Sequence, residues 1–124
     1  MTDDLFSRLL PRIAQITKEI DNRFRRQVWE FSHDADMVER MAVMSNGIVR
    51  MANLCVVGSH SVNGVSRLHS DILKDTVFND FYRLSPYKFT NVTNGIAHRR
   101  WLCQANPDLT AYLTKLIGGG FDLD

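Results

Sequence analysis

A regular spacing of apolar side chains after Pro11 predicts a long amphipathic helix. The apolar positions recur every three or four residues, which places them on one face of a helix: Ile13, Ile16, Ile20, Phe24, Val28 and Phe31. Proline is tolerated in the first helical turn, so Pro11 fits the start. After a polar turn at 32–36, Met37–Met41 indicates a shorter helix, and Asn46-Gly47 provides a signal for its end.

A short apolar run, Leu54–Val57, predicts a strand that is buried on both faces of a sheet. Gly58 bounds the run, and we expect the extended segment to cover residues 48–57. A polar loop follows at 59–63. In an open α/β sheet, ligands bind just beyond the carboxyl ends of strands, so this loop is the first candidate for a binding site.

Helical spacing returns after Gly64. Apolar residues again recur at intervals of three and four: Val65, Leu68, Ile72, Leu73, Val77 and Phe78. We therefore expect a helix from Val65 to about Leu84, ended by Ser85-Pro86, and then a short extended piece over Phe89–Val92.

The C-terminal part predicts helices only. One helical stretch starts near Ala97, and Asn106-Pro107 starts another that Gly118 ends. Together these patterns predict an α/β fold that is predominantly helical, with one or two short strands. So few strands do not complete a sheet, because a buried strand needs neighbours to satisfy its backbone groups. We therefore expect an incomplete slice of a larger α/β domain.

Composition narrows the class of protein only a little. The chain has 124 residues, 44% hydrophobic and 23% charged, with a net charge of +1, which is ordinary for a globular protein and gives no general attraction to nucleic acid or anionic lipid. No apolar segment approaches a signal peptide or a membrane span, so we expect a cytoplasmic protein. Cys55 and Cys103 lack metal-site spacing and are expected to be reduced core residues.

Four residues of the loop and the following helix start are candidates for ligand binding. A histidine in such a loop, His60, is either a solvated residue or a ligand contact. Asn63 and Gly64 can supply a left-handed turn and a helix cap, and Ser66 can be a polar residue of the first helical turn. His69 lies nine positions beyond His60 and completes no recognised metal motif, so we expect it on a helix surface.

Three motifs in sequence order closely resemble the α-glucan (glycogen, starch and maltodextrin) phosphorylases. They are LLPRI at 9–13, MANLCVVGSHSVNGVSRLHS at 51–70 and KFTNVTNGIAHRRWL at 88–102. The resemblance runs from about Leu5 to Gly118. It implies that residues 1–124 form a single partial domain, an internal fragment of the N-terminal half, within the N-terminal domain of a GT-B-type glycosyltransferase.

The resemblance also implies an activity and a set of partners. Full-length relatives transfer a glucosyl unit from the nonreducing end of an α-1,4-glucan to phosphate, which gives α-glucose 1-phosphate. In them the matching histidine contacts a sugar hydroxyl, so His60 is implied to position substrate. Asn63 and Gly64 fall in a mobile loop that shapes the glucan channel, and Ser66 falls where a small residue lines the sugar pocket. The family is usually homodimeric, and no nucleic acid or membrane is implied.

The family cofactor, pyridoxal phosphate, forms a Schiff base with a lysine of the C-terminal domain. The lysines here match no part of that motif: Lys18, Lys74, Lys88 and Lys115. We therefore expect the isolated chain to carry no catalytic residue, cofactor or metal and to be inactive alone.

Two other functions stay open at the level of sequence. A non-catalytic glucan-binding or scaffolding module is the first alternative, supported by the aromatic residues Phe78, Phe81, Tyr82 and Tyr87. The second is a helical nucleic-acid-binding protein that uses His98–Trp101, although the matching segment of the family is structural and the chain is nearly neutral.

Overall fold

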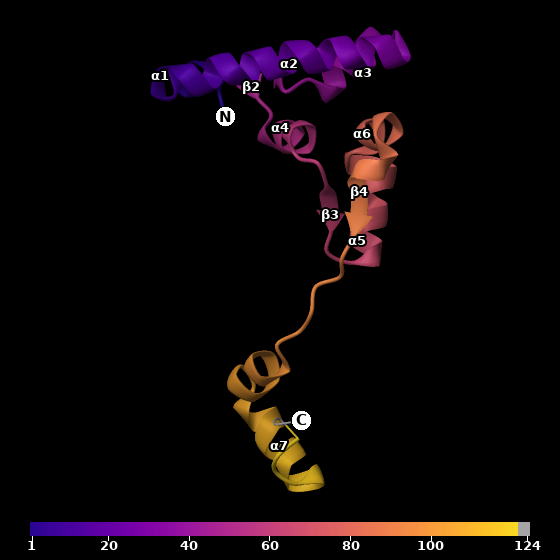
Figure 1. Cartoon of the computed structure of the whole chain (residues 1–124). Coiled ribbons are helices and arrows are strands. Elements are labelled where there is room, and N and C mark those ends of the chain that lie inside the picture. Colours follow the sequence, from indigo (N-terminus) through magenta and orange to yellow (C-terminus); the bar gives the residue numbers. More distant parts are fainter. Residues whose placement is uncertain (122–124) are drawn as a thin grey trace. The chain divides into compact units, whose positions relative to one another are not determined.

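The computed structural model describes residues 1–121, which fall into two compact units, Met1–Thr93 and the segment from Asn94 onward (Figure 1). Both units are built mainly from helices, and the strands are only two or three residues long. The prediction of a predominantly helical α/β chain is therefore confirmed. The expectation of a single partial domain over 1–124 stays a prediction.

The first unit begins with three helices, α1 (Asp3–Leu9), α2 (Pro11–Ser32) and α3 (Ala35–Met41). The predicted long helix is confirmed, but its buried face is rotated from the isoleucine-rich stripe. The side chains that α2 buries are Ala14, Thr17, Asp21, Phe24 and Val28. Ile13 and Ile16 are exposed by 47% and 45%, because the small and polar residues of α2 pack against α1 and the following hairpin.

Residues after α3 form an antiparallel hairpin, β1 (Met44–Ser45) and β2 (Ile48–Val49). Its turn residues Asn46 and Gly47 have φ values of 51° and 71°, which is the backbone that two-residue hairpins require. The prediction that Asn46-Gly47 ends a helix is therefore wrong. Asparagine and glycine favour positive φ at helix ends and in hairpin turns alike, so the dipeptide does not separate the two.

Helix α4 (Met51–Gly58) replaces the predicted strand, so the assignment of Leu54–Val57 as a buried strand is wrong. A short apolar run does not distinguish a strand from a partly buried helix by its pattern alone. Only Val56 of that run is buried, while Cys55 is exposed and Cys103 half-buried. The expected core position of Cys55 is also wrong.

Polar contacts fix the orientation of α4. Asn53 Nδ2 lies 3.3, 3.2 and 3.0 Å from the carbonyl oxygens of Arg40, Met41 and Ala42, and Arg50 Nη1 donates to the Glu39 and Arg40 carbonyls at 2.6 and 3.1 Å. These donors satisfy carbonyls at the end of α3 that have no partner within the helix.

A parallel strand pair completes the first unit. Strand β3 (Val62–Gly64) pairs with β4 (Phe89–Asn91), and Figure 1 shows α5 beside them. The connection contains α5 (Arg67–Ile72), the π-helical turn η1 (Leu73–Val77), α6 (Asn79–Leu84) and the 3₁₀ turn η2 (Pro86–Lys88). The predicted helix from Val65 to about Leu84 and the extended piece at Phe89–Val92 are therefore confirmed in outline, whereas β3 lies in what was expected to be loop.

Close packing between β3 and α5 depends on Gly64. The residue is buried, and a Cβ built at this position would lie 2.7 Å from Ser70 Cα and also against Ser70 Oγ. Gly64 does not have a positive φ, so the expected left-handed turn at this residue is wrong. Glycine is needed here because two backbones approach each other, not because of a turn.

The core of the first unit joins α2, α3, α4, α6 and β4. It contains Phe24, Val28, Met37, Met41, Val56, Phe81 and Phe89. The Phe24 and Phe81 rings stack with centroids 5.8 Å apart, and Tyr82 packs edge-on against Phe89 at 5.6 Å. These contacts place α6 against α2 and β4 against α6.

The second unit contains η3 (Arg99–Gln104), a π-helical segment, and α7 (Pro107–Ile117). Asn106 Oδ1 accepts a hydrogen bond from Leu109 N at 3.2 Å, and Gly118 with φ of 87° follows the last turn. The predicted start and end of this helix are thus confirmed. No helix within residues 1–121 is long and apolar enough to cross a bilayer.

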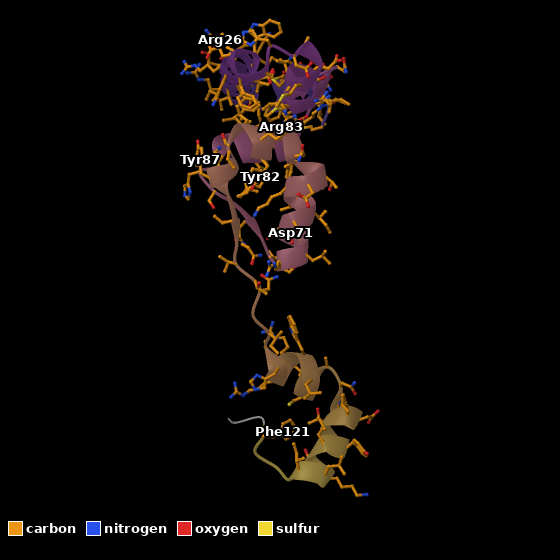
Figure 2. The ribbon with its side chains drawn as sticks, turned by 90° about the vertical axis from the view of Figure 1, so that its right-hand side faces the viewer. Arg26, Asp71, Tyr82, Arg83, Tyr87 and Phe121 are labelled. Carbon is orange, nitrogen blue, oxygen red and sulfur yellow. The ribbon has the colours of Figure 1, made fainter. Side chains whose placement is uncertain are left out.

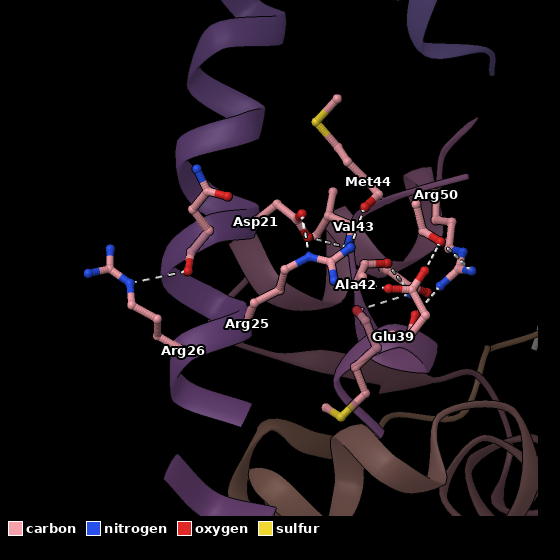
Figure 3. A network of polar contacts seen from close by, with 12 residues as sticks. Asp21, Arg25, Arg26, Glu39, Ala42, Val43, Met44 and Arg50 are labelled. Carbon is pink, nitrogen blue, oxygen red and sulfur yellow. Dashed lines mark hydrogen bonds and ion pairs between the residues drawn. The ribbon is translucent and has the colours of Figure 1, made fainter. Parts of the chain in front are cut away.

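A buried carboxylate holds the N-terminal helices to the hairpin (Figure 3). Asp21 is 4% exposed and accepts from Arg25 Nε at 2.8 Å and from the Val43 backbone N at 2.7 Å. Arg25 also donates to Glu39 Oε2 at 3.0 Å and to the Met44 carbonyl at 2.6 Å. One arginine therefore connects α2 with α3 and β1.

This network shifts the pKa values of two of its residues, Glu39 and Arg25. A hydrogen bond from the Ser45 hydroxyl, followed by one from Arg25, lowers the pKa of Glu39 below its ordinary value. Burial works to lower the pKa of Arg25, but its bonds to Asp21 and Glu39 outweigh that and raise it. Both shifts favour the charged forms of Arg25 and Glu39, which form an ion pair in this structure.

We predict that Asp21→Ala lowers the free energy of unfolding by about 3 kcal/mol, because it removes the acceptor of Arg25 Nε and of the buried Val43 N–H. Glu19→Ala is the matched control. Glu19 forms the same kind of i,i+4 pair with Arg23 on α2 at 2.7 Å, but both side chains are more than half exposed, so the expected loss is about 0.5 kcal/mol. Urea denaturation of the chain measures both, and equal losses would contradict the assignment.

The lowered pKa of Glu39 predicts an acid-dependent loss of stability. The unfolded chain takes up this proton at higher pH than the folded chain, so stability from Glu39 is present above the ordinary glutamate pKa and falls as the pH decreases toward the folded value. Thermal midpoints measured from about pH 6 to pH 3 should fall less steeply in Glu39→Gln than in the parent chain. Parallel curves would show that Glu39 does not contribute.

We also predict that Gly64→Ala destabilises the first unit by about 1–3 kcal/mol, because the added methyl group would overlap Ser70. Gly58→Ala is the control, since a Cβ there meets nothing within 4 Å and Gly58 closes a helix. The control should be neutral or slightly stabilising. Urea midpoints that respond equally to the two substitutions would show that the β3–α5 contact is not tight.

Candidate functional site

The candidate loop joins a helix to a strand. Residues Ser59–Ser61 follow α4 and lead into β3, so the loop precedes a strand instead of following one. The expected position beyond the carboxyl end of a buried strand is therefore wrong. The loop is short, and its two neighbouring elements define where its polar side chains lie.

Lys88 holds the end at which the chain enters the loop. Its Nζ donates to the carbonyl oxygens of Val56 and Val57 at 3.0 and 3.2 Å, and both belong to the last turn of α4. The backbone N of Ser59 bonds to the Cys55 carbonyl at 3.0 Å and closes the same turn. An ammonium group at a helix C-terminus is stabilised by the negative end of the helix dipole.

Strand pairing holds the other end of the loop. Val62 is in register with Phe89, Asn63 with Thr90 and Gly64 with Asn91. The hydroxyls of Ser61 and Thr90 lie 3.3 Å apart. The three-residue loop is therefore bounded by a capped helix and by a parallel strand pair.

His60 lies in the middle of this loop and is exposed. Among residues 1–121, no hydrogen bond, ion pair or ring contact is formed by its imidazole. A neutral imidazole offers one donor and one acceptor. Both are therefore open to a ligand that approaches the loop.

Asn63 and Ser66 have different surroundings. Asn63 is exposed on β3, and its amide makes only long contacts, 3.4 Å to the Val92 carbonyl and 3.4 Å to Thr90 Oγ1. Ser66 is the N-cap of α5, and its hydroxyl accepts from His69 N at 3.1 Å. The cap of α5 is therefore Ser66, and not Asn63 or Gly64, to which the sequence pattern assigned it.

His69 is half-buried and contributes to the same helix start. Its Nδ1 is placed 3.2 Å from the Val65 backbone N, which donates to it. Its position on helix α5 is as expected.

Asn91 makes polar contacts that the sequence pattern did not predict. Its Nδ2 donates to the Gly64 carbonyl at 3.0 Å and to Ser70 Oγ at 2.7 Å, and Ser70 Oγ donates to the Ser66 carbonyl at 2.8 Å. This chain of bonds brings Gly64 and Ser66 together. No hydrogen bond within the described residues joins His60 to them. The sequence pattern gives no signal for this contact.

The aromatic residues do not form a sugar-stacking platform. Phe81 is in the core, and Phe78 and Tyr82 pack against it. Tyr87 is 79% exposed, and Figure 2 shows it at the edge of the first unit. Three of the four aromatic residues that support a glucan-binding module are therefore used for packing.

The four lysines lie on separate elements of the chain. Lys88 bonds to backbone carbonyls, and Lys74 lies 5.6 Å from the centre of the Tyr82 ring. Lys18 and Lys115 are exposed, on α2 and on α7 in the second unit. Within residues 1–121, no three His, Cys, Asp or Glu side chains are grouped so that they could hold a metal ion.

A hollow of about 450 Å³ lies between α1, α2 and the β1–β2 hairpin. Its lining includes Lys18, Asp21 and Ser45, but none of the four predicted substrate-binding residues. This hollow is therefore not a pocket at the candidate loop. An enclosed sugar site at His60 would need additional residues around the loop.

Comparison with known proteins identifies the family. The carbohydrate phosphorylase family model matches residues 1–124. Glycogen phosphorylase of Bacillus subtilis (strain 168) is 54% identical over 115 residues, which cover 92% of this chain and 14% of that protein. The muscle forms of glycogen phosphorylase from Homo sapiens and Rattus norvegicus are 50% and 49% identical over 126 residues, 97% of this chain and 15% of each relative. The chain thus spans a small part of the length of these relatives, and it belongs to the carbohydrate phosphorylase family.

Proposed function

We propose that this chain supplies one wall of the glucosyl site of an α-glucan phosphorylase. The observation that carries the proposal is the loop Ser59–Ser61, which is held at both ends and leaves the His60 imidazole without a protein partner. Because the backbone of the loop is held at both ends, less backbone freedom is lost when His60 binds a hydroxyl group, which favours a positioning role.

The reaction of the complete enzyme would be phosphorolysis. A glucosyl unit moves from the nonreducing end of an α-1,4-glucan to phosphate and gives α-glucose 1-phosphate. His60 would hydrogen-bond a hydroxyl of that unit, and the exposed amide of Asn63 could turn from its long contacts to a second polar group. Gly64 and Ser66 would act indirectly, because they shape the turn from β3 into α5.

Pyridoxal phosphate would be held outside this chain. When bound, it supplies a phosphate group that exchanges a proton with the substrate phosphate. The lysines here do not fit its binding, so the 124-residue chain alone would neither bind it nor release glucose 1-phosphate. The family resemblance further supports a cytoplasmic, homodimeric enzyme whose N-terminal GT-B-type domain contains this segment.

The proposal is tested in a chimera in which residues 5–118 replace the matching segment of the Bacillus subtilis glycogen phosphorylase. We predict that His60→Ala lowers kcat/KM by roughly five- to thirty-fold, which corresponds to about 1–2 kcal/mol for one neutral hydrogen bond and its unpaired partner. Glucose 1-phosphate release from a maltooligosaccharide measures the effect. His60→Gln retains a donor and an acceptor and should recover part of it.

His98→Ala is the matched control, because His98 is another exposed histidine and lies in the second unit. It should change kcat/KM by less than about twofold. His69→Ala is unsuitable as the control, since it removes the acceptor for Val65 N. If His60→Ala is no more damaging than His98→Ala at equal thermal stability, His60 does not contact the sugar. A loss far above thirty-fold would instead indicate a chemical role for His60.

A further inference from the structure

Both ends of the His60 loop are fixed by two consecutive residues. Lys88 binds the end of α4 through the Val56 and Val57 carbonyls, and Phe89, the next residue, pairs with Val62 at the start of β3. Lys88 lies 32 and 31 residues from Val56 and Val57 in sequence. The register of β3 with β4 fixes the other end of the loop. A shift of the Lys88–Phe89 backbone would therefore move both ends of the loop together.

The chemistry of the contact suits a lysine. The last carbonyls of a helix have no partner inside it, and α4 has only eight residues, so its final turn depends on outside donors. An ammonium group has three donors and carries the charge that a helix C-terminus favours. Lys88 is half-buried, with its stem beside a hollow of about 100 Å³ that Phe24, Val57 and Tyr87 also line.

We propose that Lys88 is a positioning residue for the glucosyl site: by binding the last carbonyls of α4, it fixes the direction in which Ser59–Ser61 leave the helix and so presents the His60 imidazole to the sugar. This inference rests on the proposed function of His60. Lys88 itself does not touch the sugar in this proposal. It acts through the loop backbone, and its effect on catalysis depends on His60.

A double-mutant cycle in the same chimera tests this dependence. Lys88→Met retains the length of the stem but removes the donors. With His60 present, it should lower kcat/KM on the order of three- to tenfold, and in the His60→Ala background by less than about twofold. Lys88→Arg retains a charged donor and should recover part of the loss. A purely structural lysine would lower activity equally in both backgrounds.

Lys74→Met is the matched control. Lys74 is also half-buried in the first unit, but it lies over the Tyr82 ring and contacts neither end of the loop. It should not show coupling to His60. Coupling as large as that of Lys88 would overturn the proposal.

Hydrogen exchange separates this inference from the proposed function. In Lys88→Met, the Ser59 amide, which closes the last turn of α4, should exchange at least about fivefold faster than in the parent chimera. Amides of α7 should not change. If His60→Ala leaves kcat/KM unaffected, the proposed function fails, while the exchange data still report whether Lys88 holds the loop. Unchanged exchange at Ser59 would overturn the role of Lys88 whatever the activity shows.

Discussion

The first unit depends on satisfying the carbonyl groups at the ends of its short helices. Helices of seven and eight residues, such as α3 and α4, are marginal in water by themselves. Their C-terminal carbonyls find donors from elsewhere in the chain: Arg50 and Asn53 serve α3, and Lys88 serves α4. These donors lie outside the helix whose end they bind, so the ends of α3 and α4 also connect elements: α3 to α4, and α4 to η2.

The Asp21–Arg25 network applies the same constraint to the hairpin. The Val43 N–H and the Met44 carbonyl lie outside helices, yet they are satisfied by two side chains one turn apart on α2. Because Asp21 is buried, its charge is tolerated only with both the arginine and the backbone donor in place. Glu39 extends the network from α2 to α3. The network therefore connects α2, α3 and β1, and α4 follows directly after this hairpin.

Sequence patterns predicted the elements whose signals are local. Pro11 and the helical spacing after it located α2, and Asn106-Pro107 with Gly118 located α7. The pattern failed where distant donors decide the structure. Leu54–Val57 is helical, and its last carbonyls are bound by Lys88, which nothing in that apolar run indicates. The role of His60 stays a prediction, and the predicted loop at 59–63 is shortened to Ser59–Ser61 by β3. The residues that fix the ends of this loop, Lys88 and Phe89, lie about 30 residues away in sequence, and their spacing from the loop gives no sign of the contact.

The charged side chains with shifted pKa values lie in contacts that hold the fold together. Catalytic acids and bases usually have pKa values shifted by burial or by neighbouring charges. Within residues 1–121, the resolved shifts belong to Arg25, Glu39 and Arg40. The Glu39 shift comes first from its hydrogen bond with Ser45 of β1, and in Arg25 the bonds to Asp21 and Glu39 outweigh the opposing effect of burial. The Arg40 shift comes first from its bond to Asp80, which joins α3 to α6. The charges of Asp21, Arg25, Glu39, Arg40 and Asp80 therefore serve contacts between the elements of the first unit.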